Sequence, residues 1–304
     1  MIRIIRTYDE IENKDLILMA SWMDAEGNIG ISKINERYVL RIAIKITEKH
    51  KIDEFKKKLG GSITFVKSEN IKHKDRYIWR LNGNNAKNLL EKIYPFLILK
   101  KYHAKMAINF YNECCSYNRK VADKHDKILY YKKEISDHSQ RGCKFGEDSI
   151  FINDIKYDDA LIYLAAFIDG DGSIRLHRII KKYKNFNGIA YKPMIIVYNT
   201  NKIIIDWMYK IFGGKIRIRN NNTQKNNKIC YWWYVDYKKA IDIINEIQPY
   251  LDIKKEQAKL NLEYQQYIDE RGSRQNRPED IYFKNNCFEK MKKLNCRGKL
   301  LKNI

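Results

Sequence analysis

The sequence is poor in the features that mark secreted, membrane and zinc-finger proteins. Its 304 residues include only 4 prolines and 6 cysteines. No CxxC pair occurs and no histidine lies at zinc-ligand spacing, so we expect reduced thiols. The longest apolar stretch, Ala160–Ile168, has nine residues, whereas a membrane span needs about 20. The first residues contain no signal-peptide core. These absences predict a soluble, intracellular protein, with room for about two domains.

Positive charge is abundant. The chain has 59 Lys and Arg residues against 37 Asp and Glu residues, a formal net charge of +22. A charge of this size predicts a polyanionic partner, most often a nucleic acid. A genome rich in A and T also raises the content of Lys, Asn, Ile and Tyr, so the charge alone leaves a second explanation open.

The chain also repeats itself. The segments Leu18–Ile31 and Tyr163–Leu176 both contain an apolar run followed by Asp, a small residue, an acid and Gly. Further landmarks follow in the same order in each half, which predicts two related domains. These are the pairs Thr47 and Thr200, Gly60-Gly61 and Gly213-Gly214, and Pro95 to Lys101 and Pro249 to Lys255. A longer loop is expected near residues 181–187, where the second half has extra residues.

Each half has the pattern of a helix, two strands, a helix, two strands and a helix. An apolar helix is expected at Asp15–Met23 and Asp158–Ile168, with acids in its first turn. The Gly pairs predict the end of the second helix of each half. We therefore expect a first repeat at 1–125, a connector at 126–156, a second repeat at 157–270, and a basic tail with a helix at 271–304.

These motifs resemble the LAGLIDADG homing endonucleases in their single-chain form with two motifs. The second copy, Leu164-Ala-Ala-Phe-Ile-Asp-Gly-Asp-Gly172, matches closely, and the first, Met19-Ala-Ser-Trp-Met-Asp-Ala-Glu-Gly27, matches more loosely. The resemblance covers about residues 12–270. It implies an α+β fold in which two pseudo-symmetric αββαββα repeats form a DNA-binding saddle of antiparallel sheets, with the motif helices packed on each other.

The resemblance also assigns site residues. The last acid of each motif, Glu26 and Asp171, is expected to bind Mg²⁺, and two or more divalent ions are expected. Lys100 and Lys254, after the prolines, match a basic position near the active site, and Glu48 and Asn201 match a polar position that orders solvent. We interpret the earlier acids, Asp24 and Asp169, as structural. The chemistry is consistent, because Mg²⁺ ions held by carboxylates can activate water and neutralise the charge of a phosphodiester.

Strand alternation predicts which side chains face the partner. Arg and Lys suit guanine edges in the major groove, and shorter polar residues suit other edges. Because the second half carries more cations on its strands, we expect a stronger guanine preference there. The expected DNA-binding residues are Ser32, Arg41, Lys45, Ser62, Thr64, Arg80, Ser173, Arg175, His177, Lys215, Arg217, Arg219, Trp232 and Tyr234.

The resulting hypothesis is a monomeric, metal-dependent endonuclease that cuts double-stranded DNA at a long, degenerate site, leaving short 3′ overhangs. Two alternatives use the same fold. One is an RNA maturase that assists intron splicing, and the other is a DNA-binding regulator that does not cleave. Loss of the motif acids would favour either alternative, and both Glu26 and Asp171 are present.

Overall fold

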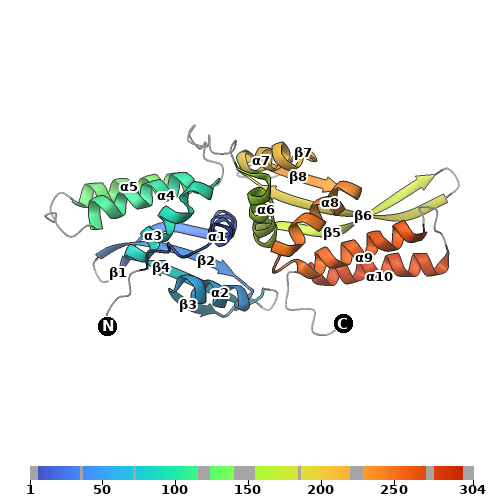
Figure 1. Cartoon of the computed structure of the whole chain (residues 1–304), viewed down its shortest axis with the longest axis horizontal. Helices are drawn as coiled ribbons and strands as arrows, with labels where there is room; N and C mark the ends of the chain where they lie inside the picture. Colours follow the sequence, from blue (N-terminus) through green and yellow to red (C-terminus); the bar gives the residue numbers. More distant parts are fainter. Residues whose placement is uncertain are drawn as a thin grey trace. The chain divides into compact units, whose positions relative to one another are not determined.

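A computed structural model of the chain describes residues 6–34, 37–70, 73–115, 124–139, 155–183, 186–219, 229–271 and 277–296. Its two compact units divide within one helix, between Tyr163 and Leu164. Each unit holds one four-stranded antiparallel sheet with helices packed on it, as Figure 1 shows. The predicted α+β class is confirmed.

The first unit begins with the expected helix and continues in the expected order. Its sheet has the strand order β1-β2-β4-β3, so β2 and β4 are the inner strands. The elements are α1 (Asn13–Glu26), β1 (Gly27–Ile34), β2 (Arg37–Ile46), α2 (Lys49–Leu59), β3 (Ser62–Val66), β4 (Arg76–Asn82), α3 (Gly83–Ile93), η1 (Tyr94–Phe96), α4 (Lys101–Phe110), η2 (Tyr111–Cys115) and α5 (Lys124–Ser139).

The second unit repeats this arrangement with the order β5-β6-β8-β7. Its elements are α6 (Tyr157–Asp171), β5 (Gly172–Tyr183), β6 (Phe186–Asn199), α7 (Lys202–Phe212), β7 (Lys215–Arg219), β8 (Cys230–Asp236), α8 (Tyr237–Ile247), η4 (Gln248–Tyr250), α9 (Lys255–Arg271) and α10 (Pro278–Leu294). The identical strand order agrees with the internal repeat read from the sequence.

The Gly pairs mark equivalent packing sites in the two cores. Trp79 and Trp233 are fully buried on the helix-covered faces of their sheets. The ring of Trp79 lies 5.8 Å from Phe55 of α2, and its Nε1 donates to Gly60 O at 2.8 Å. Trp233 Nε1 donates to Gly213 O at 2.7 Å in the second unit. Both glycines have positive φ, 79° and 62°, which favours glycine at the turn that receives the indole.

One segment differs from the sequence-based expectations, and a second adds detail to them. The extra residues of the second half extend a hairpin rather than form a longer loop, because Lys181 pairs with Gly188 and Tyr183 with Phe186. An insertion of equal length on both strands keeps the antiparallel register and lengthens the ladder. Helix α5 begins at Lys124, two residues before the expected connector, and packs on α4 and β1. Its counterpart α10 packs on α9 and β5.

Candidate functional site

Each motif helix ends at its last acid. Glu26 is the final residue of α1 and Asp171 the final residue of α6, and a strand begins at the next residue, a glycine. A Cβ on Gly27 would lie 2.5 Å from Met23 O, and one on Gly172 would lie 2.6 Å from Ile168 Cα. Because these distances exclude a side chain, glycine lets the strand leave the helix abruptly. The acid is thereby held at one end of the sheet.

Asp24 connects the end of α1 to the loop before α4. It is 2% exposed, and its carboxylate accepts the backbone N–H groups of Ile98 at 2.6 Å and Lys100 at 2.7 Å. The Tyr163 hydroxyl also donates to it at 2.7 Å. Lys100 Nζ donates to the main-chain oxygens of Met23 and Asp24 at 2.7 and 2.6 Å. The Lys100 ammonium therefore lies against the C-terminal end of the motif helix, where cations are favourable.

Asp169 connects the end of α6 to the segment before α9 in the second unit. It is 4% exposed and accepts the backbone N–H groups of Asp252, Ile253 and Lys254 at 2.7, 3.2 and 2.8 Å. Lys254 Nζ donates to Asp169 O at 2.6 Å. The two acids thus hold the lysines that follow the prolines close to the last turn of their motif helices.

Burial dominates the electrostatics of these two carboxyl groups. Burial raises the pKa of Asp24 above its ordinary value, although the Lys100 charge and the hydrogen bonds from Tyr163, Ile98 and Lys100 oppose the shift. Burial likewise raises the pKa of Asp169 against the backbone N–H groups that it accepts and the Lys254 charge. Both acids are engaged in holding the backbone, which agrees with a structural role.

Glu48 and Asn201 lie at matching places beyond the strands that pair with β1 and β5. Gly27 pairs with Ile44 and Gly172 with Val197, so the ends of β2 and β6 lie at the same sheet ends as the motif acids. Glu48 is the N-cap residue of α2 and accepts the Thr47 hydroxyl at 2.6 Å. Asn201 caps α7 by accepting the Ile203 N–H at 2.9 Å. The structure thus gives Asn201 a capping contact that the sequence-based assignment did not include.

The six residues expected to contact DNA from the first half share one sheet face, which we call the first open face. In the pairing register, Arg41 lies opposite Asn82, Ser62 opposite Arg80, and Lys45 opposite Ile78. The register also places further polar residues there that were not assigned from the sequence, namely Asn28, Arg37, Arg76 and Asn82. None of these side chains is buried. Extending the alternation of side chains from Arg80 along the whole of β4 would have predicted Arg76 and Asn82 from the sequence.

The second open face is formed in the same way. Lys215 lies opposite Tyr234 and Arg217 opposite Trp232, while Ser173 and Arg175 of β5 lie opposite Ile196 and Met194. His177 is exposed on the same face. Arg219 follows in register opposite Cys230, and its side chain lies outside the described part of the structure. Lys192, Met194, Ile196, Tyr198 and Asp236 complete the face and were not assigned from the sequence.

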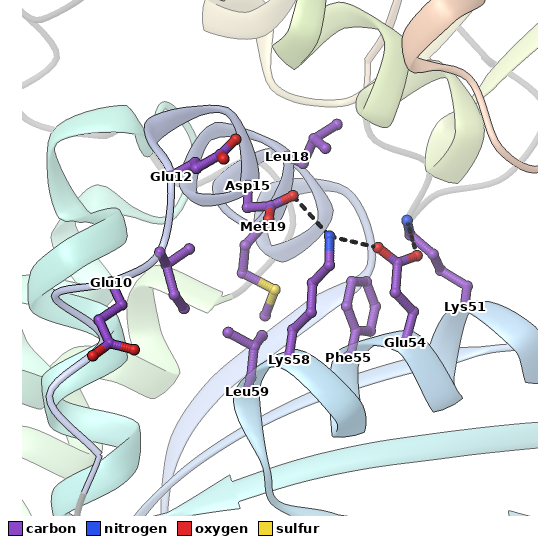
Figure 2. Close-up of a pocket in the computed structure, with 11 residues that line it drawn as sticks. Glu10, Glu12, Asp15, Leu18, Met19, Lys51, Glu54, Phe55, Lys58 and Leu59 are labelled. Carbon is purple, nitrogen blue, oxygen red and sulfur yellow. Dashed lines mark hydrogen bonds and ion pairs between the residues drawn. The ribbon is translucent and has the colours of Figure 1, made fainter.

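A cavity of about 390 Å³ lies away from these residues, between the start of α1 and α2 (Figure 2). Its charged groups pair with one another, because Lys58 Nζ contacts Asp15 at 2.9 Å and Glu54 at 3.1 Å. Burial would raise the pKa of Glu54, but hydrogen bonds and charges from Lys51 and Lys58 outweigh it and lower the pKa. These ion pairs connect α2 to α1, and we interpret the cavity as structural.

The carboxylates of each unit are few but fit a divalent metal ion. Within the described ranges, no group of three or more His, Cys, Asp or Glu side chains could hold a metal ion. Each unit instead offers one carboxylate at the end of its motif helix. This set suits Mg²⁺, which takes one or two protein carboxylates and completes its shell with phosphate oxygens and waters. No helix in the described part of the chain is long and apolar enough to cross a membrane.

Comparisons with known proteins give the fold a name. No protein-family model matches the chain. It is 27% identical over 235 residues to the intron-encoded DNA endonuclease ai2b of Dictyostelium discoideum, covering 76% of this chain and 71% of that protein. The solved LAGLIDADG meganuclease I-AabMI, bound to uncleaved DNA, matches 91% of this chain and 98% of its own with a TM-score of 0.66 and 14% identity.

The LAGLIDADG homing endonuclease I-SmaMI, bound to cleaved DNA, matches 92% of this chain and 97% of its own, with a TM-score of 0.65 and 16% identity. I-SmaMI has also been solved on an uncleaved DNA target in the presence of calcium ions. These matches span nearly the whole chain, and both structures have the two-sheet architecture built up above. The chain has the LAGLIDADG homing endonuclease fold.

Proposed function

We propose that the chain is a site-specific endonuclease that hydrolyses phosphodiester bonds of double-stranded DNA with the help of divalent metal ions. The observation that carries this proposal is made separately in each unit. A single carboxylate, Glu26 or Asp171, ends the motif helix where an open sheet face begins, and a lysine ammonium lies against the last turn of the same helix. The cleaved DNA in the I-SmaMI structure and the name of the Dictyostelium relative support the same reaction.

The chain's own residues would share the work. Glu26 and Asp171 would hold the metal, and Mg²⁺, when bound, supplies charge neutralisation at the scissile phosphate and an activated water. Lys100 and Lys254 would stabilise negative charge that develops on phosphate oxygens. Asp24 and Asp169 would act as positioning residues, because they fix the backbone that carries those lysines.

The open faces would bind the duplex. The first carries Arg37, Arg41, Lys45, Arg76 and Arg80, and the second carries Arg175, Lys192, Lys215 and Arg217. Cations spaced along both sheets would contact phosphates and base edges. The monomer would then contact two half-sites, one with each sheet. The presence of both motif acids favours cleavage over the maturase and the non-cleaving regulator.

The test separates cleavage from binding. A preferred duplex is first selected for binding from a randomised DNA library in EDTA and cloned into a plasmid. Glu26→Gln and Asp171→Asn each remove one negative charge with little change in shape. We expect each variant to cut this plasmid in Mg²⁺ at least about 10²-fold more slowly than the parent. Binding in EDTA should be unchanged or slightly tighter, because repulsion from the phosphates is relieved.

Matched controls lie at the opposite ends of the same helices. Glu12 precedes α1 and Asp158 lies in the first turn of α6, and both are exposed. Glu12→Gln and Asp158→Asn should cut like the parent. Parent-like cleavage by both Glu26→Gln and Asp171→Asn would show that the catalytic assignment is wrong.

A further inference from the structure

The two open faces carry opposite patterns of charge on their inner strands. In each sheet the inner strands, β2 and β4 or β6 and β8, lie between two outer strands. The pairing registers match, so each position of one sheet has an equivalent in the other. Equivalent inner-strand positions are Arg41 and Met194, Ala43 and Ile196, Lys45 and Tyr198, Ile78 and Trp232, and Arg80 and Tyr234.

The first open face is cationic at its centre. Arg41 Nε donates to Asn82 Oδ1 at 3.0 Å, and Arg80 Nη1 donates to Thr64 Oγ1 at 2.7 Å. These contacts orient two guanidinium groups on inner strands. The neighbouring outer strand β3 carries only uncharged groups on this face, Ser62, Thr64 and Val66. Charge is therefore concentrated on the inner strands.

The second open face is apolar at its centre. Met194, Ile196 and Tyr234 form a nearly inaccessible cluster against which Trp232 packs. Beside it, the Tyr198 ring meets the Trp232 ring edge-on at 5.1 Å, and Tyr198 is 39% exposed. We call these five residues the aromatic floor. Most of its cations come from the outer strands, where Arg175 lies on β5 and Lys215 and Arg217 lie on β7. The inner-strand cation, Lys192 of β6, is paired with Asp236 at 2.6 Å.

Those cations cover part of the aromatic floor. Lys215 Nζ and Arg217 Cζ lie 5.7 and 5.5 Å from the centre of the Tyr234 ring. Arg175 Nη2 lies 3.5 Å from Met194 Sδ. Two buried donors, Arg175 Nε and Trp232 Nε1, have no hydrogen-bond partner among the described residues. Unpaired buried donors are costly, so this face is better suited to a complex that supplies acceptors and draws the cations outward.

The width of the DNA major groove determines which strands of an open face would meet base edges and which would meet phosphates. The groove is about 12 Å wide, and neighbouring strands lie about 4.8 Å apart. A sheet laid along the groove therefore places its two inner strands over base edges and its outer strands near the phosphate rims. Cations on outer strands meet phosphates, whereas side chains on inner strands meet bases.

We propose that the second unit reads thymine methyl groups with its aromatic floor, while the first unit reads guanine with Arg41 and Arg80. This rests on the proposed function in that duplex DNA is the substrate. Thymine is the base that presents a methyl group in the major groove, with the O4 acceptor beside it, and guanine presents the paired acceptors that suit arginine. The proposal reverses the sequence-based expectation, because the second unit's cations lie mostly on outer strands.

Base analogues test the proposal on the duplex selected in EDTA, one half-site at a time. Uracil in place of thymine removes only the methyl group, and we expect about two- to fivefold weaker binding for each methyl contacted by the second unit. In the other half-site, uracil should change binding less than twofold. Replacing guanine by 7-deazaguanine removes the N7 acceptor and should weaken binding chiefly in the first unit's half-site. Crosslinking with 5-iodouracil assigns the half-sites, since crosslinked peptides should come from β6 or β8.

A protein variant provides a second readout. Tyr198→Lys introduces the residue found at the equivalent position of the first unit, and it should abolish the uracil effect at one base pair. Tyr209→Lys makes the same change on α7, at a tyrosine that is 50% exposed, and should leave the effect intact. Equal uracil effects in both half-sites, or crosslinks from the uracil-sensitive positions to β2 or β4, would overturn the inference. A selected DNA library that shows no base preference would also overturn the inference. Selective binding without cleavage would contradict the proposed function alone.

Discussion

Asp24 and Lys100 are bonded to each other in both directions. The Asp24 carboxylate accepts the Lys100 backbone N–H at 2.7 Å, and Lys100 Nζ donates to the Asp24 main-chain oxygen at 2.6 Å. Asp169 and Lys254 repeat this exchange at 2.8 and 2.6 Å. Because each bond restrains the partner of the other, the end of the motif helix and the lysine form one structural unit. This relationship motivates the first two predictions.

Asp24→Asn should destabilise the protein by about 1–3 kcal/mol. The amide has one acceptor oxygen where the carboxylate has two, so an N–H group of Ile98 or Lys100 would lose its partner in a buried site. Urea unfolding measures the change, with Asp126→Asn on the exposed surface of α5 as control. A change no larger than the control's would show that Asp24 does not hold this loop.

The difference in stability between the parent and Asp24→Asn should depend on pH in a defined direction. The pKa of Asp24 is raised in the folded chain. The Asp24 carboxyl group therefore contributes its full stabilisation below its pKa in the unfolded chain, near 4. This stabilisation is lost as pH rises through the pKa of Asp24 in the folded chain. The free energy of unfolding of the parent should exceed that of Asp24→Asn most at acidic pH, and the difference should be smaller at neutral pH. A difference that grows with pH would contradict burial as the dominant cause.

Lys100→Met should affect both folding and cleavage. Loss of the ammonium removes one donor from each of the Met23 and Asp24 carbonyls, although Met23 O keeps the Gly27 N–H, and this costs about 1–3 kcal/mol. Cleavage in Mg²⁺ should fall at least tenfold at a temperature where the variant is fully folded, while binding in EDTA changes little. Lys56→Met, on the exposed side of α2, is the control. If Lys100→Met cuts as fast as that control, Lys100 serves only as a helix cap.

Much of this arrangement was predictable because it lies in local sequence patterns. The helix-to-strand break at Glu26-Gly27 and the Gly60-Gly61 turn follow from residue type, and the alternation of β3 and β7 from hydrophobic period. The Tyr163–Asp24 hydrogen bond was not predictable, because residues 139 positions apart meet only after the chain has folded. Register was equally inaccessible. Without the strand order, the sequence predicts Lys215 and Arg217 as base-reading residues; the structure places them on the outer strand β7, where our proposal has them contact phosphates.

The salt dependence of binding should be steep. Each DNA phosphate that the protein neutralises contributes about −0.9 to the slope of log K against log salt concentration, because its counterion is released on binding. Lys215→Met should reduce the magnitude of that slope by about one, since Lys215 is exposed on an outer strand. Lys259→Met on α9, also exposed, is the matched control. A nearly flat dependence for the parent would contradict duplex binding by the open faces.

Asp236→Asn should strengthen non-specific DNA binding. Asp236 contacts Lys192 at 2.6 Å and Lys215 at 3.4 Å on the second open face. Burial would raise the pKa of Asp236, but Lys192 and Lys215 outweigh it and hold the pKa below its ordinary value. Lys215 already counts as a phosphate contact in the parent, so neutralising Asp236 adds only Lys192, and the salt slope should steepen by about one. Weaker binding at low salt would show that Asp236 instead orients the lysines.

His177 should make DNA binding depend on pH. Partial desolvation of the exposed imidazole lowers its pKa in the free chain, and the charges of Arg175 and Lys192 lower it further against the opposing Asp236. The imidazole is therefore mostly neutral at pH 7. A nearby phosphate would raise the pKa, so binding would take up a proton and affinity would increase as pH falls through the interval between the bound and free pKa values. Fluorescence titrations from pH 5.5 to about 8 measure this dependence. His177→Gln should flatten it, whereas His125→Gln on α5 should not. Unchanged pH dependence in His177→Gln would place His177 away from the phosphates.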